Sequence, residues 1–133
     1  MKISGRHMWI ALLCAYIIVI TYLCFMRPDD IPEIRPDLWG IPIDKVMHFI
    51  MFFPYPALAY AAFRPACKKI MVHLAVLLII MVTGAGVALG TEHIQGLIEY
   101  RGYEILDFYA DMLGMSCSAI LTFVYILIMK SKN

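Results

Sequence analysis

Ionisable residues gather where two strongly apolar segments meet, between Gly90 and Gly114. This stretch, GTEHIQGLIEYRGYEILDFYADMLG, carries five of the ten acidic residues of the chain, together with a histidine and an arginine. Charged groups are costly to keep beside a lipid bilayer, so they are rare there and usually functional. We therefore expect the chemistry of this protein to take place in this stretch and in the residues that pack against it.

Helical spacing places ionisable residues from three segments on shared faces, because residues three or four apart lie on the same side of a helix. Asp44 and His48 are four apart at the start of one apolar run, and Asp107 and Asp111 are four apart at the start of another. A polar pair spaced by three follows a further apolar run, and two cations lie nearby. The predicted ligand-binding set is Asp44, Lys45, His48, Glu92, Gln95, Arg101, Asp107 and Asp111.

These residues also have structural interpretations. Asp44 directly precedes a helical run and is suited to cap it. Lys45 is long enough to extend its ammonium group into the lipid headgroup region. Asp107 and Asp111 lie on an otherwise apolar helix and so need partners, and Lys45 and Arg101 are the available cations.

Three kinds of site chemistry fit this set of residues. Glu92 or His48 could act as an acid or base, but Thr91 is the only serine or threonine in this stretch and no nucleophile motif occurs. Carboxylates with His48 could hold a divalent ion, but no tight metal motif supports this, so we expect neither a metal nor a cofactor. A non-catalytic pocket could instead bind a polar head group, with Arg101 and Lys45 on its phosphate or carboxylate. We favour this binding function and leave catalytic residues unassigned.

The composition indicates a membrane protein. Of 133 residues, 62% are hydrophobic, which is more apolar surface than a soluble fold of this size could bury. The predicted fold is an all-α integral membrane four-helix bundle in a single domain, residues 1–133, without a nucleic-acid partner. Pro54 and Pro56 should kink or loosen the second span. The predicted spans are residues 8–26, 45–63, 70–90 and 106–129.

The distribution of charge predicts the orientation. With the N-terminus in the cytoplasm, the cytoplasmic segments hold seven basic residues and no acid, while the opposite side holds all ten acids. Short loops follow the positive-inside rule well. We therefore expect both termini to be cytoplasmic and the polar residues to lie on the extracytoplasmic side of the membrane.

The chain resembles the VanZ-like family of small bacterial membrane proteins in the order and spacing of four motifs: Asp44-Lys45-x-x-His48-Phe49, Glu92-x-x-Gln95, Arg101 and Asp107-x-x-x-Asp111-x-x-Gly114. The resemblance covers roughly residues 44–118. Two positions depart from the family pattern. Asp111 stands where asparagine is common, and Ser118 stands where a second glycine often occurs. The first departure adds one acidic side chain to the predicted pocket.

The resemblance implies a role at the cell envelope, in a bacterial cytoplasmic membrane. The namesake of the family is associated with reduced susceptibility to teicoplanin, a lipoglycopeptide that acts at the outer face of the membrane. The implied partners are the lipid bilayer and a polar-headed amphipathic ligand, either a lipid-linked wall precursor or a lipoglycopeptide. The alternative is a membrane-embedded hydrolase or transferase that acts on an envelope lipid, with Glu92 and His48 as acid and base.

Overall fold

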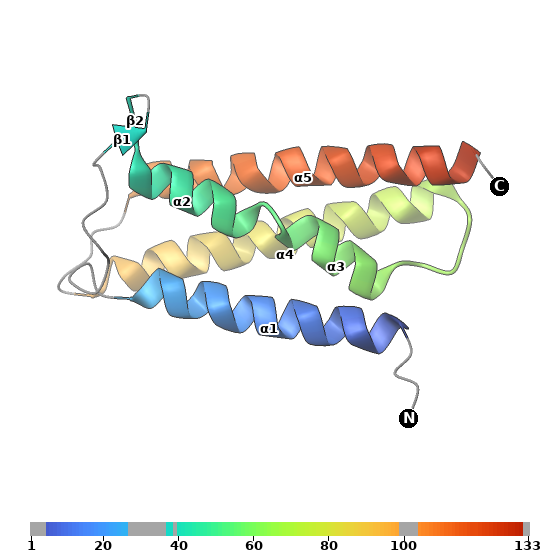
Figure 1. Cartoon of the computed structure of the whole chain (residues 1–133), viewed down its shortest axis with the longest axis horizontal. Coiled ribbons are helices and arrows are strands. Elements are labelled where there is room, and N and C mark those ends of the chain that lie inside the picture. The colour runs from blue at the N-terminus through green and yellow to red at the C-terminus, as the bar shows by residue number, and fades with distance from the viewer. Residues whose placement is uncertain (1–4, 27–36, 39, 99–103, 132–133) are drawn as a thin grey trace.

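Helices make up almost all of the computed structural model, which describes residues 5–26, 37, 38, 40–98 and 104–131. Four helical segments lie side by side along the long axis of the molecule, and the second segment consists of two shorter helices end to end (Figure 1). In chain order the elements are α1 (Gly5–Phe25), β1 (Asp37–Leu38), β2 (Ile41–Pro42), α2 (Ile43–Phe52), α3 (Tyr55–Phe63), α4 (Ile70–Gln95) and α5 (Ile105–Ser131).

The prediction of four apolar helical segments is confirmed, because α1, the α2–α3 pair, α4 and α5 are each long and apolar enough to cross a membrane. Many of their large apolar side chains point away from the bundle, as Ile18 and Leu78 do with 69% and 66% of their surface exposed. Such a continuous apolar exterior suits lipid rather than water. The main difference from the predicted bounds is in α4, which continues to Gln95. Its extra turn carries Glu92 inside the helix.

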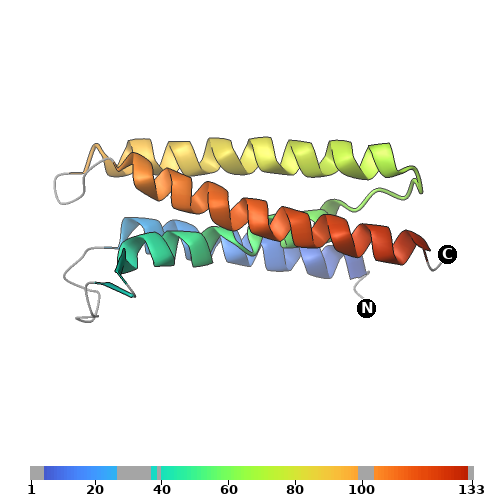
Figure 2. The ribbon, with the colours of Figure 1, turned by 90° about the horizontal axis from the view of Figure 1, so that it is seen from above.

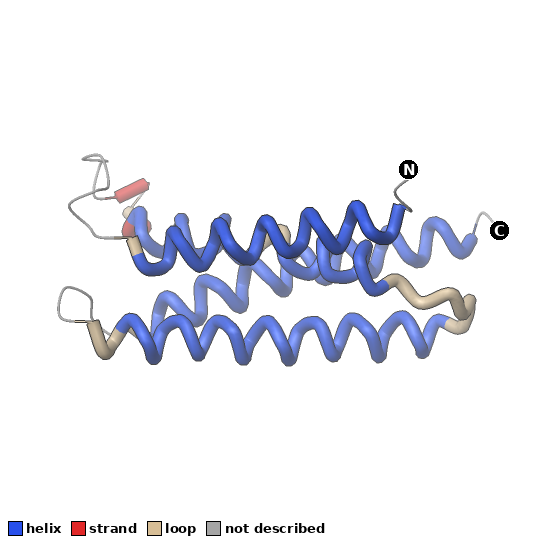
Figure 3. Tube along the Cα trace, turned by 90° about the horizontal axis from the view of Figure 1, so that it is seen from below, coloured by secondary structure: helices blue, strands red, loops and turns tan. Residues whose placement is uncertain are grey.

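Successive segments run in opposite directions, so both described ends of the chain lie at one end of the bundle (Figure 2). The β1–β2 hairpin and the start of α5 lie at the other end, which we call the hairpin end. A loop joins α3 to α4 at the end that holds the termini (Figure 3). α2 packs most extensively on α5, α1 on α3, and α4 on both α5 and α3. The first turns of α2 and α5 and the last turn of α4 therefore meet at the hairpin end.

The second segment is interrupted where Pro54 lacks the backbone N–H that a continuous helix needs. The amide of Phe53 still donates to Phe49 O at 3.0 Å, and Leu58 donates to Pro54 O at 3.0 Å to begin α3. Ending a helix leaves carbonyl groups without helical partners, and the Tyr16 hydroxyl donates to one of them, Met51 O. The predicted break at the prolines is confirmed.

Four prolines between Arg27 and Ile43 predict an irregular loop there, and the described part of it before α2 forms a small hairpin. β1 and β2 pair antiparallel, with Asp37 opposite Pro42. Gly40 lies in the turn with φ of 80°, which a side chain would strain, and its amide donates to Asp37 Oδ2 at 3.2 Å. The rest of that predicted loop lies outside the described residues.

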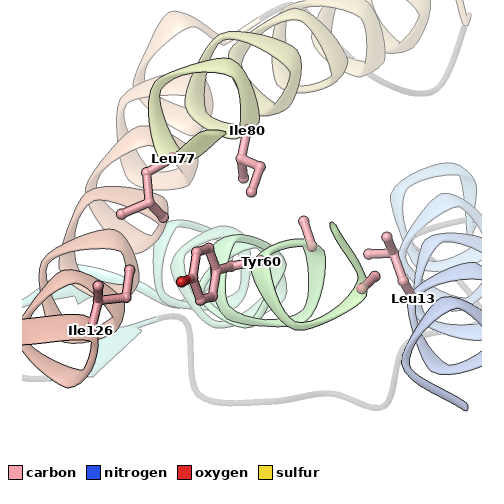
Figure 4. Packing of buried hydrophobic residues seen from close by; sticks show 7 residues of the cluster. Leu13, Tyr60, Leu77, Ile80 and Ile126 are labelled. Carbon is pink, nitrogen blue, oxygen red and sulfur yellow. The ribbon is translucent and has the colours of Figure 1, made fainter. Parts of the chain in front are cut away.

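Two apolar clusters fill the bundle. The larger joins α1, α3, α4 and α5 in the half nearer the termini, where the Tyr60 ring lies among Leu77, Ile80 and Ile126 (Figure 4). The smaller consists of Phe52, Ala88 and Met115, with 1%, 0% and 0% of their surfaces exposed. This smaller cluster matters for the site, because its members come from α2, α4 and α5.

Candidate functional site

A buried polar layer lies one helical turn from the smaller apolar cluster, towards the hairpin end. His48 precedes Phe52 by four residues on α2, Glu92 follows Ala88 by four on α4, and Asp111 precedes Met115 by four on α5. Residues four apart share a helix face, so the faces that bury the apolar cluster also bury the polar layer. At a rise of about 1.5 Å per residue, the polar residues lie roughly 5–9 Å inside the helix ends.

His48 lies at the centre of the polar layer, with only 4% of its surface exposed. Its Nδ1 lies 3.0 Å from Asp111 Oδ1 and 3.9 Å from Glu92 Oε1. On the other side of the ring, Nε2 lies 3.5 Å from Asp107 Oδ2. Three carboxylates therefore surround one imidazole, which we call the inner cluster: His48, Glu92, Asp107 and Asp111.

The inner cluster contains buried carboxylate oxygens without hydrogen bonds. Glu92 and Asp111 are both 0% exposed, and among the described residues neither oxygen of Glu92 nor Oδ2 of Asp111 has a hydrogen-bond partner. The backbone amide of Glu104 lies near the Glu92 carboxylate, but the two groups do not form a hydrogen bond of good geometry. Leaving buried polar atoms unpaired is costly, so such atoms call for an explanation.

A second polar group, the rim, covers the inner cluster on the hairpin side. Lys45 Nζ lies 2.7 Å from Asp44 Oδ2 and also forms ion pairs with Glu104 Oε2 and Asp107 Oδ1. The Asp44 and Glu104 side chains are 49% and 56% exposed, whereas those of Lys45 and Asp107 are each 14% exposed. Asp107 belongs to both groups, since one of its oxygens faces Lys45 and the other faces His48.

The structure decides between several of the interpretations of single residues. The capping interpretation of Asp44 is wrong, because α2 begins at Ile43 after Pro42 and the residue lies within the first turn. Lys45 pairs with Asp107, as the need for a counter-ion predicted, but the partner of Asp111 is His48. His93 is exposed and lies off the face of α4 that buries Glu92.

Two predicted site residues do not join either group in the described structure. Gln95 is 2% exposed, and its amide donates to the carbonyl oxygen of Cys24 at 2.6 Å, which links α4 to α1. Arg101 lies outside the described residues. Thr91, the one hydroxyl considered as a nucleophile, donates to Ala88 O of its own helix at 2.8 Å.

Glu104 is the rim residue that the predicted set omits. Its place in a polar turn suggests a solvated loop charge, yet it forms an ion pair with Lys45. Its spacing indicates that it belongs with the site, because Glu104, Asp107 and Asp111 are three and four residues apart and so lie on one helical face. The bond from the Asp107 amide to Glu104 O, at 3.0 Å, shows that this face begins just before α5.

The charges of the site are unbalanced. The rim and inner cluster together contain five carboxyl groups, one ammonium group and one imidazole (Asp44, Glu92, Glu104, Asp107, Asp111, Lys45 and His48). A bare phosphate would meet repulsion here, because Lys45 is already shared among three carboxylates. The described residues favour a cation, or a ligand that donates hydrogen bonds.

Cavities also occur away from these residues. One of about 250 Å³ lies near the termini, where Arg64, Lys68 and Lys130 surround the buried Tyr60 and His73. There the Tyr60 hydroxyl lies 2.7 Å from His73 Nδ1. The two ends of the bundle thus differ in charge, with a basic cavity near the termini and an acidic cluster at the hairpin end.

The fold and the site together define a class of protein: a small helical chain with four helices able to cross a membrane and a buried histidine–carboxylate cluster near one end. An uncharacterized protein of the fission yeast Schizosaccharomyces pombe is 34% identical over 86 residues, which is 64% of this chain and 50% of that protein. The chain therefore spans about half the length of the curated relative. No protein-family profile and no solved structure matches the chain.

Proposed function

We propose that this chain is a multi-pass, VanZ-like membrane protein whose rim and inner cluster bind the polar head of an amphipathic ligand. The observation that carries the proposal is the polar layer of His48, Glu92 and Asp111, which is enclosed by helices with an apolar exterior. A ligand with an apolar tail could lie along that exterior while its head reaches the rim. Polar groups at membrane depth are expensive and are usually retained for such a function.

The proposed orientation places the hairpin end outside the cell and both termini in the cytoplasm. It is supported by the basic residues at the end with the termini and by the acidic groups at the hairpin end. In a bacterial cytoplasmic membrane this side faces lipid-linked wall precursors and lipoglycopeptides, the ligands suggested by the resemblance.

The test measures binding directly, with teicoplanin as the probe. Purified protein in lipid nanodiscs should bind it, and Asp107→Asn should weaken binding about tenfold, or about 1.4 kcal/mol, because the site loses the carboxylate that its rim and its inner cluster share. Asp37→Asn is the matched control, since it removes one exposed acid at the same end without touching the rim. Equal binding by the wild type and Asp107→Asn would contradict the proposal, as would an absence of binding.

A second candidate function is acid–base catalysis on an envelope lipid. It is favoured by the contact of His48 Nδ1 with Asp111 Oδ1 at 3.0 Å, because a carboxylate that orients an imidazole is a common feature of general bases. Glu92 would serve as the second acid or base. Incubating purified protein with radiolabelled lipid-linked precursors tests this function, and a lack of conversion with and without divalent ions would count against it.

A further inference from the structure

The inner cluster has the donor atoms of a metal site. His48, Glu92 and Asp107 each offer one ligand atom, and these atoms all lie within 4.8 Å of one another. Small side-chain rotations would bring such atoms to metal–ligand distances of about 2.0–2.2 Å. Imidazole together with carboxylates suits divalent first-row ions such as Mn²⁺ and Zn²⁺ better than Mg²⁺ or Ca²⁺, which prefer oxygen ligands.

The unpaired oxygens of Glu92 are a second observation that points to a cation. The residue is 0% exposed, both oxygens lack hydrogen-bond partners among the described residues, and Oε1 lies 3.9 Å from His48 Nδ1. The rim also has three carboxylates with close ligand atoms, Asp44, Glu104 and Asp107, but the ammonium group of Lys45 already lies among them. Among the described residues, the inner cluster holds no such cation.

The hydrogen bonding of His48 leaves one ring nitrogen suited to a metal. When ionised, Asp111 can only accept a hydrogen bond, so at 3.0 Å the Nδ1 atom carries the proton. In a neutral ring, Nε2 then presents a lone pair towards Asp107 Oδ2, 3.5 Å away. Two lone pairs that face each other repel unless a proton or a metal cation lies between them. A carboxylate that fixes the far nitrogen of a metal-bound histidine is a common supporting arrangement.

We infer that the inner cluster binds one divalent transition-metal ion through His48, Glu92 and Asp107, with Asp111 orienting the imidazole. This departs from the expectation of no metal that the sequence supported. The ion would offset the excess negative charge and allow the head of the ligand to be a phosphate. Only that last consequence rests on the proposed function; binding of the ion stands on the geometry alone.

Metal binding can be tested on the full-length protein in detergent micelles, stripped with a chelator. Calorimetric titration with Mn²⁺, Zn²⁺, Mg²⁺ and Ca²⁺, each separately, should show one equivalent of Mn²⁺ or Zn²⁺ bound. Electron spin-echo spectroscopy of the Mn²⁺ form should show coupling to a nitrogen nucleus, which identifies an imidazole ligand. Either no binding of Mn²⁺ and Zn²⁺, or bound Mn²⁺ without nitrogen coupling, would overturn the inference.

Variants locate the ion within the bundle. Glu92→Gln keeps the side-chain size and should weaken binding by at least about 100-fold, whereas Asp111→Asn should weaken it about 10- to 100-fold by disturbing only the orientation of the ring. His48→Gln should abolish the nitrogen coupling. Its matched control is His73→Gln, because His73 is also buried but bonds to Tyr60 far from the cluster. Unchanged affinity in Glu92→Gln would overturn the inference.

The outcomes separate this inference from the proposed function. Suppose that the chelator-stripped protein binds no added ion, yet binds teicoplanin as tightly as the untreated protein does. The proposed function then stands and the metal site is refuted. If the ion binds with nitrogen coupling but teicoplanin does not bind, the metal site stands and the proposed ligand is refuted. Where a cluster variant fails to fold, the titration and spectrum of the wild-type protein still decide the question.

Discussion

At the scale of single residues, Lys45 stabilises the acidic rim by offsetting the repulsion among its carboxylates. Its ammonium group lies among Asp44, Glu104 and Asp107, and it is the one cation paired with them among the described residues. Without it, three like charges would face one another at the edge of an apolar bundle. Removing one partner of a buried ion pair is strongly destabilising, and exposure to water reduces the cost.

Replacing Lys45 with methionine should therefore lower the stability of the folded protein by about 1–3 kcal/mol, since two of the three carboxylates are partly exposed. Thermal unfolding in detergent, followed by circular dichroism, measures the change. Lys69→Met is the matched control, because Lys69 is exposed in the turn before α4 and should leave the melting temperature nearly unchanged. Equal shifts for both variants would show that the rim does not depend on Lys45.

The sequence reveals part of this residue-scale arrangement. Helical spacing predicts that Asp107 and Asp111 share a face, and the cost of charge on an apolar helix predicts that they need partners. Which partner each would take depended on the packing of α2 against α5, which spacing within one helix does not specify. For that reason the pairing of His48 with Asp111 and the ion pair of Glu104 were not predicted.

At the scale of elements, the close approach of α2 and α5 brings His48 to Asp111. A methyl group added at Gly114 would overlap the carbonyl oxygen of Phe49, so only glycine lets the two backbones lie this close. Gly114 lies three residues beyond Asp111, on the same face. The sequence showed that this glycine continues the acidic face, but it did not show which helix lies against it.

Gly114→Ala should push α2 away from α5 and destabilise the fold by about 1–3 kcal/mol, the usual cost of overpacking. It should also weaken metal binding, because His48 moves with α2. Gly86→Ala is the matched control, since an added methyl group at Gly86 of α4 meets nothing within 4 Å. Thermal unfolding and Mn²⁺ titration of both variants provide the comparison, and a fully stable Gly114→Ala protein would contradict the packing described for α2 and α5.

The break between α2 and α3 shows which structural features a proline predicts from sequence and which it does not. Pro54 predicts the interruption because it cannot donate a backbone hydrogen bond. It does not predict that the two halves pack on different neighbours, with α2 mainly on α5 and α3 mainly on α1. That division depends on side chains that are distant in sequence, such as Tyr16, whose hydroxyl donates to Met51 O beside the break.

At the scale of the whole molecule, the ends of the bundle carry opposite charge. Described basic residues lie at the end with the termini, where Arg64, Lys68 and Lys130 line one cavity, while the carboxylates of the site lie near the hairpin end. Length and hydropathy predict the four apolar helical segments, because a span of lipid requires about 20 apolar residues. The orientation stays a prediction from charge.

The native Cys67 offers a direct test of orientation, because it is exposed in the turn between α3 and α4. In protein whose other three cysteines are replaced by alanine, a membrane-impermeant maleimide should label Cys67 only after the cells are permeabilised. The matched control introduces Asp37→Cys at the hairpin end in a cysteine-free chain, and this position should be labelled in intact cells. Labelling of Cys67 in intact cells would reverse the proposed orientation.

The inner cluster is assembled from parts that are synthesised at different times. His48 emerges on α2 and Glu92 emerges on α4, but Asp111 and Asp107 arrive only with α5, the last helix of the chain. Until then Glu92 lacks the neighbours that enclose it, so an incomplete chain carries an unsheltered acid. A chain that stops before α5 therefore leaves this acid exposed on an otherwise apolar helix.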